Sequence, residues 1–79
     1  MNRISRTKAV NMIVNSKGKF FTVKFIKQNG ETRVINGNLK GLNSLGYLRV
    51  NSIKDKQVRN VNTQTITGLT INGINYRVR

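Results

Sequence analysis

The sequence contains no cysteine, no histidine and no proline, and only two acidic residues. Without cysteine and histidine, the chain has no disulfide framework, no thiol nucleophile and no zinc site built from those ligands. No apolar run approaches the roughly 20 residues that cross a bilayer as a helix, and the polar segment Met1–Arg6 precedes no signal-peptide core. The absence of a membrane-spanning run and of a signal-peptide core predicts a cytoplasmic protein.

Groups that could carry out catalysis are also scarce. The only carboxylates are Glu31 and Asp55, and both fall in predicted turns beside lysine or arginine, where they are expected to balance surface charge. No hydroxyl has a histidine to activate it, and the segment 37–41 lacks the glycine spacing of a phosphate-binding loop. The sequence therefore predicts a protein that is not an enzyme and uses no metal or other cofactor.

Positive charge dominates the composition. Fifteen lysines and arginines face two acidic residues, which gives a net charge of +13. In a compact domain about 25 Å across, this excess creates a strong positive field and costs folding free energy through self-repulsion. A polyanionic partner would relieve that repulsion. The alternative is a charge excess that serves only solubility, but solubility is ordinarily achieved with both signs and a smaller imbalance.

The pattern of apolar residues predicts one short helix followed by strands. Residues 3–15, within an N-terminal segment 1–16, carry an apolar stripe at helical spacing, with Ser5 as N-cap. From Lys19 the period changes to two. The expected strands are 19–27, 31–36, 47–53, 57–61, 67–71 and 74–79, with a loop over 37–46 and a helical turn over 62–65. Asn29-Gly30 and Asn72-Gly73 predict hairpin turns in which both residues have positive φ.

These elements predict a single mainly β domain over residues 1–79. Short antiparallel strands joined by tight turns favour closure, because closure removes exposed edges. A helical turn just before the penultimate strand fits an SH3-like barrel better than an OB-fold. We therefore expect a small SH3-like barrel of five to six antiparallel strands over 19–79, preceded by the short helix in 1–16.

Three stretches carry a resemblance to known proteins. They are Ser16–Lys27 with the following Asn-Gly turn, Tyr47–Val50 leading into Val58–Asn62, and Thr65–Val78. In these stretches, which span nearly the whole chain, the sequence resembles small proteins of tailed bacteriophages described as SH3-like β-barrel proteins. The resemblance implies the barrel fold and a phage context, in the host-cell cytoplasm or the virion. It brings no catalytic or binding motif.

The candidate binding residues are cations on the expected outer face and aromatic residues near them. If alternate apolar residues point inward, the cations between them form an outward band that could neutralise several phosphates. The candidates for nucleic-acid binding are Arg3, Arg6 and Lys8 at the helix start, Lys24, Arg33, Arg49, Arg59 and Arg77 on the strands, and the aromatic residues Phe20 and Tyr47. The three cations at the start of the helix are expected either to face a phosphate or to belong to a frayed terminus.

Two rings make a thin platform for stacking bases, so the sequence favours contacts with the phosphate backbone over single-strand binding. The expected function is weakly sequence-specific, salt-dependent binding of duplex DNA, with DNA preferred over RNA. The alternative is a phage effector or virion component that binds an acidic protein surface, either a host enzyme that it inhibits or a capsid or portal protein. A membrane surface is not an expected partner, because the apolar stripe of the helix is short and lacks tryptophan.

Overall fold

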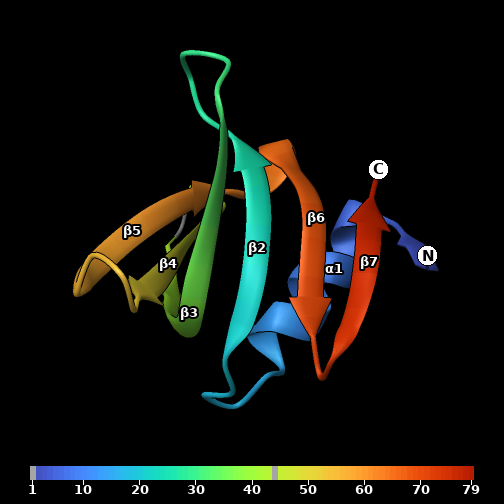
Figure 1. Cartoon of the computed structure of the whole chain (residues 1–79), viewed down its shortest axis with the longest axis horizontal. Coiled ribbons are helices and arrows are strands. Elements are labelled where there is room, and N and C mark those ends of the chain that lie inside the picture. The colour runs from blue at the N-terminus through green and yellow to red at the C-terminus, as the bar shows by residue number, and fades with distance from the viewer. Residues whose placement is uncertain (1, 44) are drawn as a thin grey trace.

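The computed structural model describes residues 2–43 and 45–79, which form a curled β-sheet with one α-helix packed against it (Figure 1). The strands are β1 (Asn2–Ile4), β2 (Phe21–Ile26), β3 (Thr32–Leu42), β4 (Tyr47–Ser52), β5 (Gln57–Asn62), β6 (Ile66–Ile71) and β7 (Ile74–Val78). The helices are α1 (Arg6–Val14) and the 3-10 turn η1 (Thr63–Thr65). The expected mainly β fold with a short helix near the start of the chain is confirmed.

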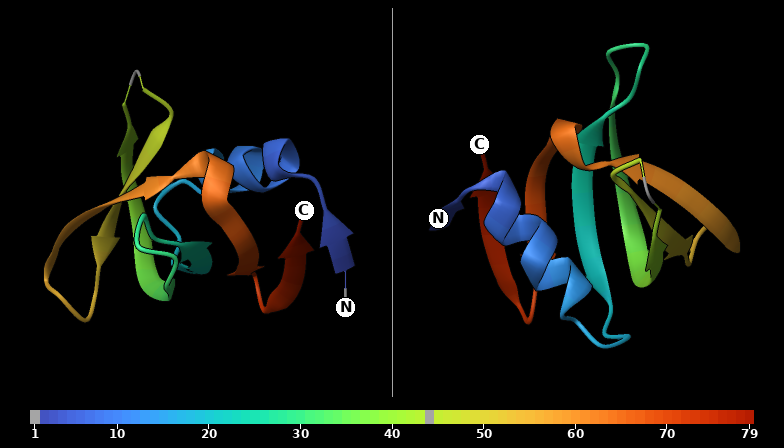
Figure 2. Two further views of the ribbon diagram at one scale, coloured as in Figure 1. Left: turned by 90° about the horizontal axis from the view of Figure 1, so that it is seen from above. Right: turned by 180° about the vertical axis from the view of Figure 1, so that it is seen from behind.

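The strands are hydrogen-bonded in the order β1-β7-β6-β2-β3-β4-β5. β1 runs parallel to β7 and the other neighbours are antiparallel, so the sheet is mixed. In the described residues β1 and β5, at the two ends of this order, do not pair with each other, and the sheet curls without closing (Figure 2). The expected closed barrel of five to six antiparallel strands is therefore wrong in closure and in strand number, because a further strand that was not predicted, β1, joins the sheet and runs parallel to β7.

The start of the chain differs most from its expected structure. The helix predicted over 3–15 begins only at Arg6, because Asn2–Ile4 pair with Tyr76–Val78 of β7. Ser5 is the N-cap as expected, and its Oγ accepts a hydrogen bond from the backbone N–H of Lys8 at 3.1 Å. A strand of three residues is too short to show an alternating pattern, which is why its sequence carries no recognisable signal.

Both Asn-Gly turns make hairpins, but with different geometry. The Asn72–Gly73 turn has φ values of 54° and 75°, as a two-residue hairpin turn requires. In the other hairpin only Gly30 has a positive φ (87°), and its N–H donates to the carbonyl of Lys27 at 2.9 Å. This is a type I turn followed by a left-handed glycine. The expectation that Asn29 also has a positive φ is wrong; its side-chain oxygen instead accepts from the N–H of Glu31.

β3 occupies much of the segment expected to be a loop. Its first half pairs with β2 and its second half with β4, so this long strand carries the bend between two parts of the sheet. At Gly37, where the two halves meet, an added Cβ would lie 1.8 Å from the carbonyl oxygen of Asn51. A bulge follows between Leu39 and Gly41. The glycines that suggested a loop therefore serve close strand approach and curvature.

The hydrophobic core lies between α1 and the inner face of the curled sheet. The view from behind shows α1 lying across this face (Figure 2). Its buried residues are Ile4, Ala9, Ile13, Phe21, Val23, Phe25, Ile35, Leu48, Val50, Val61, Ile66, Leu69, Ile71 and Val78. Ala9 and Ile13 are the helix side chains in this core, and both are fully buried. Because strand residues alternate between faces, the residues between the core positions form the outer face of the sheet.

Candidate nucleic-acid interface

The outer face of β1, β7, β6 and β2 carries three cations in one line. Arg3 of β1 pairs with Arg77 of β7. Arg77 pairs with Gly68 of β6, which in turn pairs with Lys24 of β2. All three cations are exposed and each is adjacent in its strand to a core residue, so they lie on the side of the sheet opposite the core and α1. This side of the sheet faces the viewer in Figure 1. At about 4.8 Å per strand, this cation row, Arg3, Arg77 and Lys24, is about 14 Å long.

Gly68 leaves a shallow groove within the cation row. An added Cβ at Gly68 would meet the Cβ of Lys24 at 3.5 Å and its Cδ at 3.8 Å, so the lysine side chain extends over the glycine. A groove of about 280 Å³ is bordered by Lys24 and Arg77 and passes over Gly68. The two cations therefore line the same depression and can contact one anion-bearing chain together.

A second line of polar side chains runs beside the cation row. It consists of Asn75, Thr70, Thr22 and Asn36, which are paired across β7, β6, β2 and β3 and which we call the amide row. Thr70 donates a hydrogen bond to the amide oxygen of Asn75 at 2.6 Å, and Thr22 donates to that of Asn36. This arrangement leaves the amide nitrogens, each with two N–H groups, as donors. Cations and neutral donors side by side suit phosphate oxygens.

Both carboxylates of the chain lie away from the cation row. Glu31 is in the turn between β2 and β3, at the tip of the hairpin that projects from the sheet (Figure 1). Asp55 is in the turn between β4 and β5 and forms ion pairs with Arg33 and Arg59. Since the chain has no other acidic residue, the strands that carry the cation row contain no negative charge to balance it.

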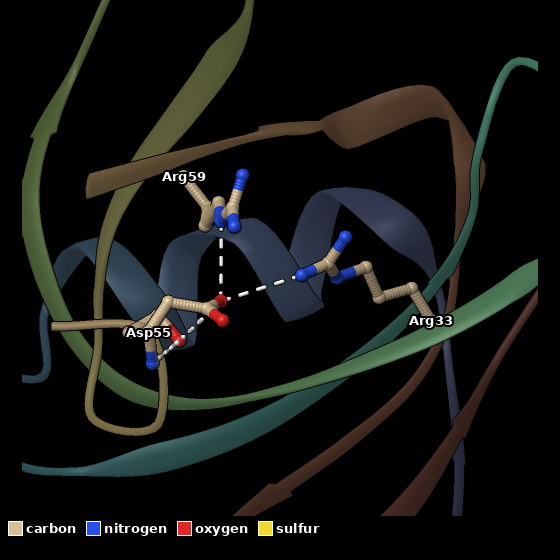
Figure 3. A network of polar contacts seen from close by, with 4 residues as sticks. Arg33, Asp55 and Arg59 are labelled. Atoms are coloured by element: carbon tan, nitrogen blue, oxygen red, sulfur yellow. Dashed lines mark hydrogen bonds and ion pairs between the residues drawn. The ribbon is translucent and has the colours of Figure 1, made fainter. Parts of the chain in front are cut away.

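Arg33 and Arg59 face the inner side of the sheet, and the expectation that they point outward is wrong. They pair with Phe25 and Val50, which are core residues. Arg33 Nη2 lies 3.3 Å from Asp55 Oδ2, and Arg59 Nε lies 3.1 Å from the same oxygen (Figure 3). Cations fit on this inner face because both side chains are about one third exposed and have a carboxylate beside them. Of the five strand cations that were expected to point outward, Arg33 and Arg59 therefore lie on the inner face, whereas Lys24, Arg49 and Arg77 lie on the outer face.

Asp55 is held in its ionised form. Its Oδ2 accepts hydrogen bonds from Arg59, from the Ser52 hydroxyl at 3.1 Å and from Arg33. The hydrogen bond from Arg59 and then that from Ser52, together with the charges of both arginines, lower the pKa of Asp55, although partial desolvation acts in the opposite direction. This carboxylate therefore orients two guanidinium groups and is unsuited to donate a proton at neutral pH.

Three other predicted cations lie outside the cation row. Arg6 donates to the carbonyl oxygens of Gln64 at 2.7 Å and Arg79 at 3.4 Å, so it joins α1 to η1 and to the C-terminal residue. Lys8 is exposed on α1, and Arg49 is exposed on the outer face of β4. The sheet order separates β4 from β2 by one strand, so the fold does not add Arg49 to the row.

The two predicted aromatic residues occupy different parts of the molecule. Phe20 precedes β2 and is 64% exposed. It precedes Lys24 by four residues, a Cα separation of about 13 Å in an extended chain. Tyr47 is half-buried at the start of β4 and lines a cavity with Arg33 and Arg59. The two rings therefore do not form a common stacking platform.

The amide row was not predicted from the sequence. Thr70 and Asn75 flank the Asn72–Gly73 turn at equal distances, so the register of a two-residue hairpin alone places them opposite each other. Applying that register would have identified this pair. The position of Thr22 and Asn36 beside it depends on β2 pairing with β6, which is a contact between segments far apart in the chain.

Comparisons of the chain with known proteins found no match, so the interface is interpreted from its own geometry. No family model matches the chain, and neither a curated protein nor a solved structure does so. In the part of the chain that the structure describes, neither helix has the length and apolar character needed to cross a membrane.

Proposed function

We propose that this protein is a non-catalytic nucleic-acid-binding module that contacts the backbone of duplex DNA through the outer face of β1, β7, β6 and β2. The observation that supports the proposal is the cation row: three exposed cations lie in one register line, with no acidic residue on their strands. The amide row beside it supplies uncharged donors to the same surface.

The geometry of the cation row suits a phosphate backbone. Duplex DNA presents one negative charge per about 1.7 Å of helix axis, so a row about 14 Å long faces several phosphates. Donors to phosphate fix the position of a protein on the duplex but carry no sequence information. Binding is therefore expected to be strong at low salt and weakly dependent on sequence.

The proposal includes no catalysis. Histidine, the commonest general acid–base group, and cysteine are both missing from the chain, and it has only two carboxylates. One of the two, Asp55, is occupied by Arg33, Arg59 and Ser52.

The finer assignment of the fold is part of the same proposal. A small curled sheet with η1 directly before β6 supports an SH3-like type, which is the type of the phage proteins that the sequence resembles. In a phage context the protein would act in the host-cell cytoplasm or in the virion, and DNA would be the polyanion that relieves its charge repulsion.

The salt dependence of binding tests this interface. Fluorescence anisotropy with a labelled duplex of about 20 base pairs measures affinity between about 50 and 200 mM salt, where contact with three phosphates predicts a loss of about 40-fold. The double variant Lys24→Gln/Arg77→Gln should reduce the slope of log K against log salt by about 1.8, because two phosphate contacts are lost. Single strands and RNA of equal phosphate number are measured in parallel.

A matched control separates this surface from total charge. Lys40→Gln/Lys54→Gln removes the same charge from exposed positions of β3 and the β4–β5 turn, and it should leave most of the slope unchanged. Equal effects of the two double variants would assign binding to the charge of the whole molecule. Absence of binding to every nucleic acid at about 50 mM salt, with a partner from bacterial lysate that survives nuclease treatment, would replace DNA with an acidic protein surface.

A further inference from the structure

A cavity separate from the cation row opens between the β2–β3 hairpin and β5. Its volume is about 520 Å³, within the range of small-molecule sites. The wall includes Phe25 and Ile35 from the core side and Lys27 from the hairpin. Arg33 and Arg59 lie on the inner side of this opening, and the residues that line it come from the strands and their connections and not from α1.

The two arginines are oriented by a carboxylate that does not itself line the cavity. Asp55 Oδ2 receives one N–H from Arg33 and the Nε–H from Arg59 (Figure 3). Each guanidinium has five N–H donors, so most donors of both groups are not used by Asp55. Lys27 adds a third positive charge, and neither carboxylate of the chain is among the lining residues. The cavity is therefore built to receive an anion.

Other lining residues suit a planar, hydrogen-bonding group beside that anion. Tyr47 offers a half-buried ring, and Asn60 offers an amide group that can both donate and accept. The amide oxygen of Asn62 already accepts from the N–H of Gln64, so Asn62 offers its two N–H donors. Aromatic rings and arginine planes stack with nucleobases, and amides pair with base edges.

We propose that this cavity binds one nucleotide unit, with Arg33 and Arg59 on the phosphate and Tyr47, Asn60 and Asn62 on the base. The site is distinct from the duplex-binding face and does not depend on it. The same chemistry is presented by a free nucleoside monophosphate and by an unpaired nucleotide at the end of a DNA strand.

Nuclear magnetic resonance titration of the isotope-labelled protein with AMP and UMP tests the proposal without any variant. Saturable shifts are expected for the amides of Arg33, Arg59 and Asn60. Inorganic phosphate should produce weaker binding at the same residues, because it lacks the base. The absence of saturable shifts up to about 10 mM nucleotide, or equal affinity for phosphate and nucleotide, would overturn the assignment.

Variants locate the site and separate it from the proposed duplex interface. Arg59→Gln should weaken AMP binding at least about tenfold, and Arg59→Lys, which keeps the charge but not the planar fork, should be intermediate. Arg3→Gln is the matched control, with the same charge change on β1, at the opposite end of the sheet order from β5. Lys24→Gln/Arg77→Gln should retain AMP binding even where duplex binding is lost. Loss of AMP binding in Arg3→Gln and Arg59→Gln alike would refute a local site.

Competition distinguishes the two sources of the nucleotide. A blunt duplex and the same duplex with a one-nucleotide overhang are added to the AMP complex. Displacement of AMP by the overhang alone supports an unpaired strand end as the occupant, and displacement by neither supports a free nucleotide. Displacement by the blunt duplex at the same concentration as by the overhang would contradict a site for one unpaired nucleotide.

Discussion

At the scale of single residues, Gly37 shows how one missing side chain permits the fold. β3 passes from its pairing with β2 to its pairing with β4 at this residue, and the carbonyl oxygen of Asn51 occupies the space that a Cβ would need. The obstacle is backbone, which cannot move aside as a flexible side chain can. The requirement for glycine is therefore steric.

Replacement of Gly37 by alanine should lower the free energy of unfolding by about 3 kcal/mol or more, because β3 and β4 must separate. Gly41→Ala is the control: it lies in the same strand with nothing within 4 Å of its added Cβ, and it should change stability by less than about 1 kcal/mol. Urea unfolding followed by circular dichroism measures both variants. Similar stability of the two would contradict the close approach of the strands.

Asp55 makes stability depend on pH at the same scale. Its pKa is lower in the folded protein than in the unfolded chain, so the stabilisation by the ionised carboxylate is complete above the unfolded pKa and disappears as pH falls through the folded pKa. Asp55→Asn should therefore be less stable than the parent near pH 6, and the difference should shrink as pH falls below about 4. Chemical unfolding at several pH values measures it. A constant difference down to pH about 2 would show that the ion pairs add nothing.

At the scale of elements, α1 begins under unfavourable electrostatics. Its first turn contains Arg6 and Lys8 and no acidic residue, although the N-terminus of a helix disfavours positive charge. Ser5 offsets this by accepting from the N–H of Lys8, and Arg6 directs its charge to the carbonyl oxygens of Gln64 and Arg79. The helix start is thus held by its cap and by tertiary contacts.

Ser5→Ala should cost about 1 kcal/mol of stability, because the cap acceptor is lost. Ser5→Asp is the informative control: it restores the acceptor and adds a negative charge at the helix N-terminus, so it should equal or exceed the parent in stability. Thermal unfolding at low ionic strength compares the three proteins. If Ser5→Asp were as unstable as Ser5→Ala, capping would not be what holds this helix.

At the scale of the whole molecule, charge is distributed asymmetrically. The net charge of +13 occupies a body of 30 × 29 × 25 Å, and both carboxylates lie in turns that flank β3 and β5. The strands β1, β2 and β7 contain cations but no carboxylate. The fold therefore places three unbalanced cations in a row on one face, and it places the paired charges of Arg33, Arg59 and Asp55 on the other side of the sheet.

The sequence alone determined the net charge, the short capped helix, the η1 turn and both hairpins, because these depend on composition, on residue period and on turn residues that are neighbours in the chain. It did not determine that Asn2–Ile4 join β7, that the glycines at 37 and 41 belong to a strand, or that Arg33 and Arg59 meet Asp55. Those features arise from the order of the strands and from how far the sheet curls. The alternating pattern along a strand predicts that successive residues face opposite sides of the sheet. Only the long-range pairing of strands decides which side is covered by α1 and which cations become neighbours.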